Sequence, residues 1–151
     1  MNYEGIPKYE KGGMNYEDVV YLNFFMEANQ KYIELRKRVK GYALRIINLY
    51  ASLPKTTVAQ VIGKQILRSG TSVGAQFCEG RRAKSTADFV SKNEGSLSEL
   101  EETLYWLELL VEANIVKDTL LAPLMKETDE LTAILTSIVK RAKEKKTKKN
   151  S

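Results

Sequence analysis

A chain of 151 residues, 43% of them hydrophobic, is long enough for one domain with its own core, which excludes a wholly disordered protein. One cysteine and no histidine exclude an intrachain disulfide and remove the commonest general base and metal ligand of enzymes. The net charge of +5 permits an anionic partner such as nucleic acid, and no apolar run is long enough for a membrane span or a signal peptide. We therefore expect a cytoplasmic protein that is not an enzyme and has no cofactor or metal.

A flexible leader is predicted over residues 1–15, because glycine and proline occupy four of its positions. The first helix is clearest over residues 32–52, and since Phe25 and Ala28 keep its phase, we extend it back to residue 16. Its apolar residues recur in steps of three and four, as in a helix seam. This seam consists of Tyr32, Leu35, Val39, Tyr42, Ile46, Leu49 and Leu53, and Pro54 ends the helix.

The second helix is predicted over residues 57–83, with an apolar stripe of Ala59, Ile62, Ile66, Val73 and Phe77. Three of its glycines, Gly63, Gly70 and Gly74, share one face, where a neighbouring helix could pack unusually close. The alternative is a break at residues 69–72, which would divide the segment into two shorter helices.

The third helix begins with a capping signal, since Ser85 suits the N-cap and Asp88 follows at the third helical position. Its seam has the seven-residue repeat that is typical of coiled-coil packing. The repeat consists of Val90, Leu97, Leu104 and Val111, with Asn93, Leu100, Leu107 and Asn114 between them. We expect this face of the helix to be buried in the core.

The fourth helix is predicted over residues 120–146, with Pro123 in its first turn, followed by a basic disordered tail over residues 147–151. Its seam consists of Leu121, Leu124, Thr128, Leu131, Leu135, Ile138 and Ala142. Because the links between the four helices are short, sequential helices should be antiparallel. The sequence therefore predicts one all-α domain over residues 16–146, an antiparallel up-and-down four-helix bundle.

Charge is distributed unevenly among the predicted helices. Residues 85–116 carry a net charge of −6, whereas residues 31–52 and 53–84 each carry +5 and residues 117–151 carry +4. One interpretation is that the acidic third helix pairs with its basic neighbours inside the bundle, which would favour one topology. The other is that unpaired basic side chains form a binding face.

Several strings in the middle of the chain carry a resemblance to a known family. They are residues 42–50 (YALRIINLY), residues 65–75 (QILRSGTSVGA), Glu79-Gly80, Ser85, Asp88-Phe89, Lys92, Glu99, Glu102-Thr103 and residues 105–110 (YWLELL). Over residues 38–142 the chain resembles the bacterial four-helix-bundle proteins first noted in intervening sequences of 23S ribosomal RNA genes.

This resemblance implies a four-helix bundle that assembles into a ring-shaped pentamer and has no enzymatic activity. It also implies a distant relation to the accessory proteins of diversity-generating retroelements, which bind nucleic acid and a reverse transcriptase. Two positions depart from the family pattern. Gln76 replaces an asparagine of the second helix, and Ser98 replaces a lysine of the third helix, which removes one basic residue.

Nine basic residues are candidates for binding RNA or DNA through an electrostatic interface whose affinity falls steeply with salt. They are Arg68, Arg81, Arg82, Lys84, Lys140, Arg141, Lys143, Lys145 and Lys146. The structural alternatives are that the cations after the second helix stabilise its carboxyl end, that Arg68 pairs with a glutamate of the third helix, and that the lysine-rich tail is only solvated.

A second apolar face is predicted on the third helix, formed by Tyr105, Trp106, Leu109 and Ala113, which point away from the predicted seam. Tyrosine and tryptophan are enriched at interface hot spots. We therefore expect this face to bind another copy of the chain, and the number five comes from the resemblance alone. The alternative is that residues 24–26 (FFM) fold over this face.

No motif in the sequence supports catalysis. Glu94, Glu101 and Glu108 repeat every seven residues, but a di-metal bundle site also needs Glu-x-x-His motifs. Cys78 has no histidine to activate it. The predicted function is a non-enzymatic, homo-oligomeric assembly or adaptor protein that binds RNA or DNA, with a reverse transcriptase as a further candidate partner. The alternative is a purely structural or protein-binding oligomer without a nucleic-acid role.

Overall fold

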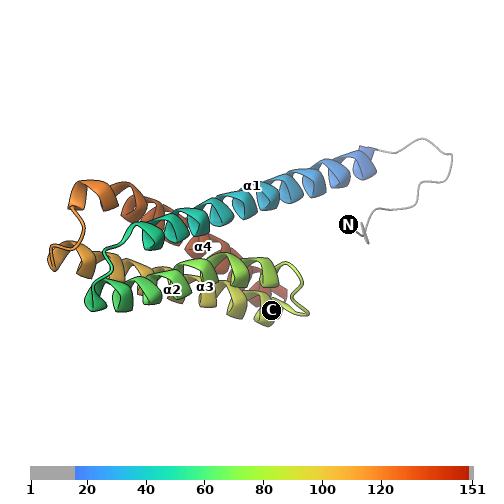
Figure 1. Cartoon of the computed structure of the whole chain (residues 1–151). Helices are drawn as coiled ribbons and strands as arrows, with labels where there is room; N and C mark the ends of the chain where they lie inside the picture. Colours follow the sequence, from blue (N-terminus) through green and yellow to red (C-terminus); the bar gives the residue numbers. More distant parts are fainter. Residues whose placement is uncertain (1–15, 150–151) are drawn as a thin grey trace. The chain divides into compact units, whose positions relative to one another are not determined.

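The computed structural model describes residues 16–149, and this part of the chain consists of four helices without a strand (Figure 1). The helices are α1 (Tyr16–Ser52), α2 (Thr57–Gly80), α3 (Thr86–Glu112) and α4 (Asp118–Lys149). The all-α prediction is confirmed, and the second helix is continuous rather than broken at residues 69–72. The predicted leader, residues 1–15, and residues 150–151 lie outside the described residues.

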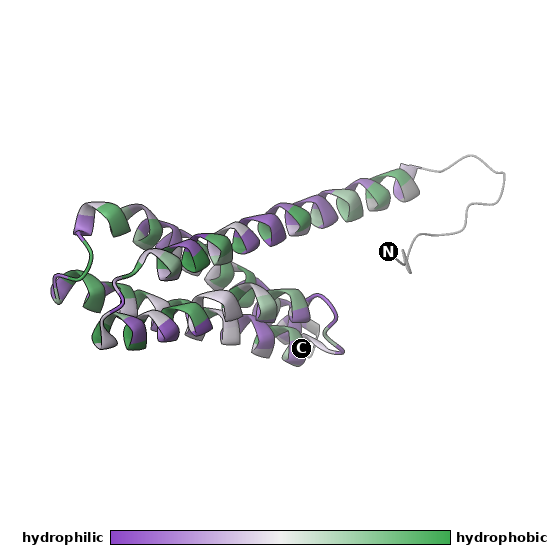
Figure 2. Ribbon diagram, viewed as in Figure 1, coloured by the Kyte–Doolittle hydropathy of each residue, from purple (hydrophilic) through white to green (hydrophobic). Residues whose placement is uncertain are grey.

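Among the described residues, contacts divide the chain into two units, residues 16–34 and residues 35–149. In the first unit, the described residues form the beginning of α1, on which Phe24 and Met26 are exposed. In the second unit, the remainder of α1 packs with α2, α3 and α4 as an antiparallel up-and-down four-helix bundle. Apolar and polar residues alternate along each ribbon, as expected for amphipathic helices (Figure 2).

Side chains at the start of α3 hold the connection between α2 and α3. The Ser85 hydroxyl accepts a hydrogen bond from the Asp88 N–H at 3.1 Å, which confirms Ser85 as the N-cap. The Asp88 carboxylate in turn accepts the Lys84 N–H at 3.1 Å. α2 ends three residues earlier than predicted, because the Arg81 and Arg82 amides bond to carbonyls three residues back and close the helix.

The other helix ends correct three predictions. Asn114 is exposed just past the end of α3, not buried in the core, and its φ of 56° is one that asparagine tolerates at a helix end. α4 begins at Asp118, so Pro123 lies in the second turn and removes a hydrogen bond to the Thr119 carbonyl. α4 also continues to Lys149, because residues 147–149 contain no proline or glycine that would end it.

The buried face of α3 differs from the predicted seam. Leu100 and Leu107 are fully buried as predicted, but the repeat of Val90, Leu97, Leu104 and Val111 is only half-buried. The core face consists of Asn93, Ser96, Leu100, Thr103, Leu107 and Leu110. Small hydroxyl side chains occupy core positions because their hydrogen bonds are satisfied there, as when Ser96 Oγ donates to the Val73 carbonyl of α2 at 2.9 Å.

Each helix contributes one hydroxyl side chain to a buried polar layer. The hydroxyl oxygens of Tyr42 on α1 and Thr128 on α4 lie 2.8 Å apart, and those of Ser69 on α2 and Thr103 on α3 lie 2.7 Å apart. Burial raises the pKa of Tyr42 to about 12, so the phenol remains protonated at neutral pH. Ser69, Thr103 and Thr128 also bond carbonyls of their own helices, so the buried phenol of Tyr42 is the group that sliding a helix would leave unpaired. This layer therefore favours the alignment of α1 with α4 that pairs Tyr42 with Thr128.

The glycine face of α2 lies close to α1, which confirms the prediction made for these residues. A Cβ atom added at Gly63 would lie 2.6 Å from Leu53, and one added at Gly70 would lie 2.7 Å from Ile46. The third glycine of this face also lies against α1, at an ordinary van der Waals distance. The missing side chains therefore allow the two helices to approach closely.

Replacing Gly70 by alanine is expected to lower the free energy of unfolding by about 1–3 kcal/mol, because the new methyl group would overlap Ile46 in a packed core. Gly41→Ala is the matched control on α1, since nothing lies within 4 Å of a Cβ at that position. Alanine there should raise the free energy of unfolding by about 0.5–1 kcal/mol through helix propensity. Urea denaturation followed by circular dichroism measures both variants, and equal effects would contradict the close approach.

An ion-pair cluster joins α1 to α4. The Arg38 guanidinium donates to Glu127, with Nε 2.7 Å from Oε1 and Nη2 2.9 Å from Oε2, and Nη2 also lies 2.5 Å from Glu130 Oε2. The hydrogen bonds from Arg38 hold the pKa of Glu127 below its ordinary value. Ionised Glu127 therefore stabilises the folded state.

Lowering the pH is expected to remove the stabilisation that ionised Glu127 contributes to the folded state. Because the folded-state pKa of Glu127 is lower than the unfolded value of about 4.3, the stabilisation is complete above that value and is lost as pH falls through the folded-state pKa. Glu127→Gln should lower the free energy of unfolding at neutral pH by about 1 kcal/mol, since Arg38 is partly exposed, and should weaken the acid dependence. Urea denaturation between about pH 7 and pH 3 measures both effects, with the exposed Glu144→Gln as the control. Identical pH profiles for wild type and Glu127→Gln would contradict this account.

Candidate nucleic-acid interface

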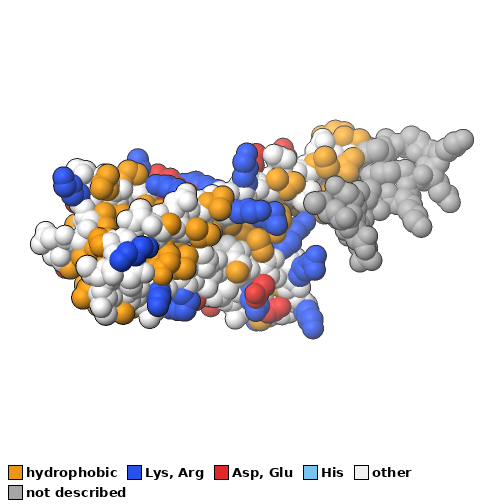
Figure 3. Space-filling view, in the orientation of Figure 1, with side chains coloured by type: hydrophobic (Ala, Val, Ile, Leu, Met, Phe, Trp, Pro, Cys, Tyr) orange, Lys and Arg blue, Asp and Glu red, His pale blue; other side chains and the backbone are white. Residues whose placement is uncertain are grey.

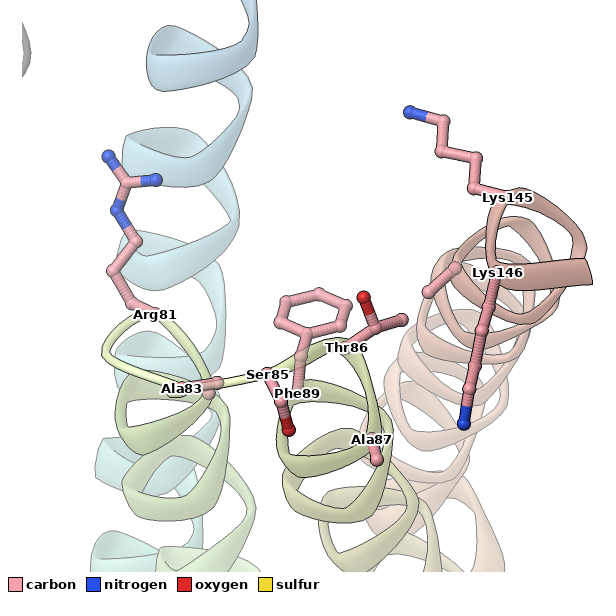
Figure 4. Close-up of a pocket in the computed structure, with 10 residues that line it drawn as sticks. Arg81, Ala83, Ser85, Thr86, Ala87, Phe89, Lys145 and Lys146 are labelled. Atoms are coloured by element: carbon pink, nitrogen blue, oxygen red, sulfur yellow. The ribbon is translucent and has the colours of Figure 1, made fainter. Parts of the chain in front are cut away.

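A groove of about 690 Å³ lies where α2 ends, α3 begins and α4 approaches its carboxyl end (Figure 4). It is lined by Gly80, Arg81, Ala83, Ser85, Thr86, Ala87, Phe89, Ala142, Lys145 and Lys146. Every charged side chain of this lining is a cation. The fold thus brings together one cation of the turn after α2 and two of the lysines of α4, which are far apart in the sequence.

The groove side chains come from three elements. Figure 4 shows Arg81 on one side of the groove and Lys145 on the other, with Phe89 and Thr86 of α3 between them. Lys145 and Lys146 extend in opposite directions from α4, and Lys146 also lines a neighbouring hollow of about 210 Å³. Basic residues therefore lie on both sides of the start of α3.

The start of α3 adds to the positive potential of the groove. By helix geometry the amides of Thr86 and Ala87 have no acceptor within the helix, and the helix dipole places a partial positive charge at this end. The Asp88 carboxylate in the first turn opposes this potential, but it accepts the Lys84 N–H and does not line the groove. Together these features suit the groove to an anion such as a phosphate group.

Phe89 gives the groove an apolar surface beside its cations. The ring is half-buried, so part of it is open to solvent within the groove. Aromatic rings next to basic side chains are typical of proteins that bind single-stranded nucleic acid, where unpaired bases stack on the ring and cations contact the backbone. The arrangement can therefore hold both a phosphate and a base.

The other basic candidates near the groove are all exposed, namely Arg82 and Lys84 on the turn beside the groove and Lys140, Arg141 and Lys143 on α4. Lys143 in addition pairs with Glu94 of α3, with Nζ 2.5 Å from Oε1. On the face shown in Figure 3, Lys and Arg side chains clearly outnumber Asp and Glu.

Arg68 lies on α2, roughly 20 Å along the helix axis from the groove. Its guanidinium hydrogen-bonds Glu102 and lies 3.7 Å from the Glu99 carboxylate, and Trp106 Nε1 donates to Glu102 at 3.2 Å. The hydrogen bonds from Arg68 and Trp106 hold the pKa of Glu102 below its ordinary value, whereas burial raises the pKa of Glu99. The alternative in which Arg68 pairs with a glutamate of the third helix is confirmed.

The four candidate interface residues, three on α3 and Ala113 directly after it, differ in exposure. Tyr105 is 54% exposed and Ala113 is also exposed, whereas Trp106 and Leu109 are half-buried. The rings of Tyr105 and Trp106 meet edge to face, with centroids 5.1 Å apart. Trp106 donates a hydrogen bond to Glu102, which also pairs with Arg68. Tyr105 is therefore the aromatic residue of this pair that is presented to solvent.

Cys78 is half-buried in α2. Within residues 16–149, no group of three or more His, Cys, Asp or Glu side chains is arranged to hold a metal ion. In the same range, no helix combines the length and the apolar character that crossing a bilayer requires.

Sequence reasoning did not identify Thr86 and Phe89 as groove residues. The sequence did contain a signal for Phe89, which lies about one helical turn after the N-cap Ser85. The basic residues Arg81, Arg82 and Lys84 directly precede this N-cap. The meeting of Arg81 with Lys145 could not be read from the sequence, because helix periodicity gives the phase of each helix and not its alignment with the others.

Comparisons with known proteins cover the bundle. The family profile described as 23S rRNA-intervening sequence protein matches residues 31–137. A solved structure of a protein of unknown function, from the S23 ribosomal protein family of Bacteroides thetaiotaomicron, is 39% identical with a TM-score of 0.66 and covers 70% of this chain and 97% of that chain. Curated protein sequences give no significant match. The α2 and α3 sides of the groove lie within the profile match, whereas Lys145 and Lys146 lie beyond it.

Proposed function

The chain belongs to the 23S rRNA-intervening sequence protein family, and from this premise we propose that it is a non-enzymatic helical-bundle protein that assembles with copies of itself and binds single-stranded RNA or DNA. The observation that carries the nucleic-acid part is the groove in which Arg81, Lys145 and Lys146 surround the start of α3. The assembly part rests on the exposed Tyr105 and on the family resemblance, which supplies the number five. A reverse transcriptase is a further candidate partner through the same resemblance.

The groove would act on the backbone of the strand rather than on its sequence. Arg81 and the two lysines of α4 would neutralise phosphates, and the amides at the start of α3 would donate hydrogen bonds to phosphate oxygens. Phe89 would stack on one unpaired base, and stacking accepts any base. We therefore expect binding that depends strongly on salt and weakly on sequence.

Self-assembly would multiply the effect of a single groove. One groove offers few phosphate contacts, so its own affinity should be low. Several grooves on one assembly would contact the same strand, and the later contacts would form at a high effective concentration. Long strands should therefore bind more tightly than strands that reach only one groove.

Fluorescence anisotropy with a labelled single strand of about 20 nucleotides tests the proposal directly. Binding should be detectable at about 50 mM salt and should weaken steeply by about 200 mM salt. A duplex of the same length should bind less tightly, because its bases are not free to stack on Phe89. No binding at the lower salt concentration would remove the nucleic-acid function.

The alternative function is an oligomer without a nucleic-acid role. The ion pair between Lys143 and Glu94 favours this alternative, because it pairs a cation of α4 within the bundle rather than offering it to nucleic acid. This alternative predicts an assembled protein that shows no salt-dependent binding of RNA or DNA. The anisotropy experiment therefore separates the two functions.

A further inference from the structure

Two helices carry a second stripe of exposed residues, opposite to the face that each buries in the core. The α1 stripe consists of Lys37, Lys40, Leu44, Ile47 and Ala51, and the α3 stripe consists of Ser98, Glu101, Tyr105, Glu108 and Glu112. Residues recur in steps of three and four in both stripes, which is the spacing of a helix–helix seam. Each stripe spans about 20 Å, so the two have the same length.

The stripes carry opposite charges that no partner in the bundle neutralises. Within the described part of the chain, Lys37 and Lys40 form no ion pair, and the same holds for Glu101, Glu108 and Glu112. The other glutamates of α3 differ in this respect. Glu94, Glu99 and Glu102 each lie within ion-pair distance of a lysine or arginine. The unpaired charge of α3 is thus concentrated on its outer stripe.

The two stripes cannot meet within one copy of the chain. The α1 stripe lies across the helix from Tyr42 and Ile46, and the α3 stripe lies across the helix from Leu100 and Leu107, all of which are fully buried. Both stripes therefore point out of the bundle. A residue of one stripe can reach the other only on a second molecule.

We propose that the α1 stripe of one copy packs antiparallel against the α3 stripe of the next copy. This inference rests on the proposed self-assembly and specifies the two surfaces that would carry it. In the antiparallel register the central Leu44 meets the central Tyr105, Lys40 meets Glu108, and Lys37 meets Glu112. A parallel register would pair only Lys40 with a glutamate, Glu101, and would place Lys37 on Ser98, so the charges favour the antiparallel one.

The contact joins two different surfaces, so each copy uses α1 toward one neighbour and α3 toward the other. Such a heterologous contact closes into a ring or extends into a filament, whereas a two-fold dimer would need one surface that binds itself. The apolar centre supplies the burial, since Leu44 and Tyr105 are each 54% exposed in the single chain. The charged ends select the neighbour and the register.

Charge exchange tests the contact. Lys37→Glu/Lys40→Glu and Glu108→Lys/Glu112→Lys each place like charges against each other, and each should raise the dissociation constant of the assembly roughly 100-fold. The chain with all four substitutions restores opposite charges and should assemble again. An equimolar mixture of the two double variants should also associate, because each offers the stripe that the other needs, but only into assemblies with an even number of copies, since an alternating ring of five would keep one contact between like charges. Light scattering after size-exclusion chromatography gives the masses, and circular dichroism checks that every variant is folded.

The outcomes separate this inference from the proposed function. An assembled wild type whose mass is unchanged in both double variants would overturn the contact and leave self-assembly standing. Double variants that dissociate and are restored neither by mixing nor by the fourfold exchange would also overturn it. If the Lys37→Glu/Lys40→Glu variant binds RNA less tightly but keeps the wild-type mass, the α1 stripe serves nucleic acid instead of assembly. A wild type that is monomeric throughout would refute both the contact and self-assembly.

Discussion

Replacing Arg81, Lys145 and Lys146 together by alanine is expected to lower the affinity for single-stranded RNA or DNA roughly 100-fold at about 0.1 M salt. Each cation that neutralises a phosphate of a single strand contributes about 0.7 to the slope of log K against log salt concentration. Losing three of them should therefore reduce that slope by about 2, and the affinities of variant and wild type should converge near 1 M salt. Anisotropy titrations at several salt concentrations measure both quantities.

The matched control removes the same charge elsewhere. Lys55, Lys64 and Lys117 are exposed and do not line the groove, and replacing all three by alanine gives the same net charge as the groove variant. If binding depended only on net charge, the two variants would lose the same affinity. An equal loss in both would contradict a localised interface, and a loss confined to the groove variant would support it.

Replacing Tyr105 by serine is expected to dissociate the assembly, raising its dissociation constant roughly 30-fold or more. Tyr105 is more than half exposed in the single chain, so the substitution should leave the bundle folded. An exposed tyrosine that fills a partner surface is typical of interface hot spots, where truncation costs about 2 kcal/mol or more. Sedimentation across a range of protein concentrations measures the change.

Leu120→Ser is the control for loss of exposed apolar surface. Leu120 is 69% exposed, and it lies on α4, outside both stripes. This variant should keep the wild-type mass at the concentrations where Tyr105→Ser is monomeric. Dissociation of both variants to the same degree would show that assembly depends on general hydrophobicity rather than on the α3 surface.

Most of the fold follows from the sequence because its signals are local. Pro54 marks the end of α1, Ser85 caps α3, and the glycines of α2 that share one face do allow α1 to approach. These signals depend on residues within one or two turns of each other. The same reasoning placed Asn93, Leu100 and Leu107 of α3 correctly in the core but missed Ser96 and Thr103, because apolar periodicity overlooks hydroxyls whose hydrogen bonds are satisfied when buried.

The candidate site was only partly predictable. The sequence identified Arg81 and the lysines of α4 as basic clusters, but their meeting in one groove depends on how α2, α3 and α4 align. The alignment of α2 with α3 is favoured by the buried hydrogen bond from Ser96 to the Val73 carbonyl, which no local pattern predicts. The ion pair of Arg68 was expected, because an acidic helix beside a basic one offers many partners.

The central claim is that an assembly of this chain, not the single chain, binds nucleic acid. Light scattering coupled to size-exclusion chromatography at about 50 mM salt, with and without a labelled single strand, tests this claim most directly. We predict a protein mass near five times 17.1 kDa that carries the strand, and loss of the strand from the same assembly at high salt. A protein that elutes at 17.1 kDa at micromolar concentration, with the strand eluting separately, would contradict the account.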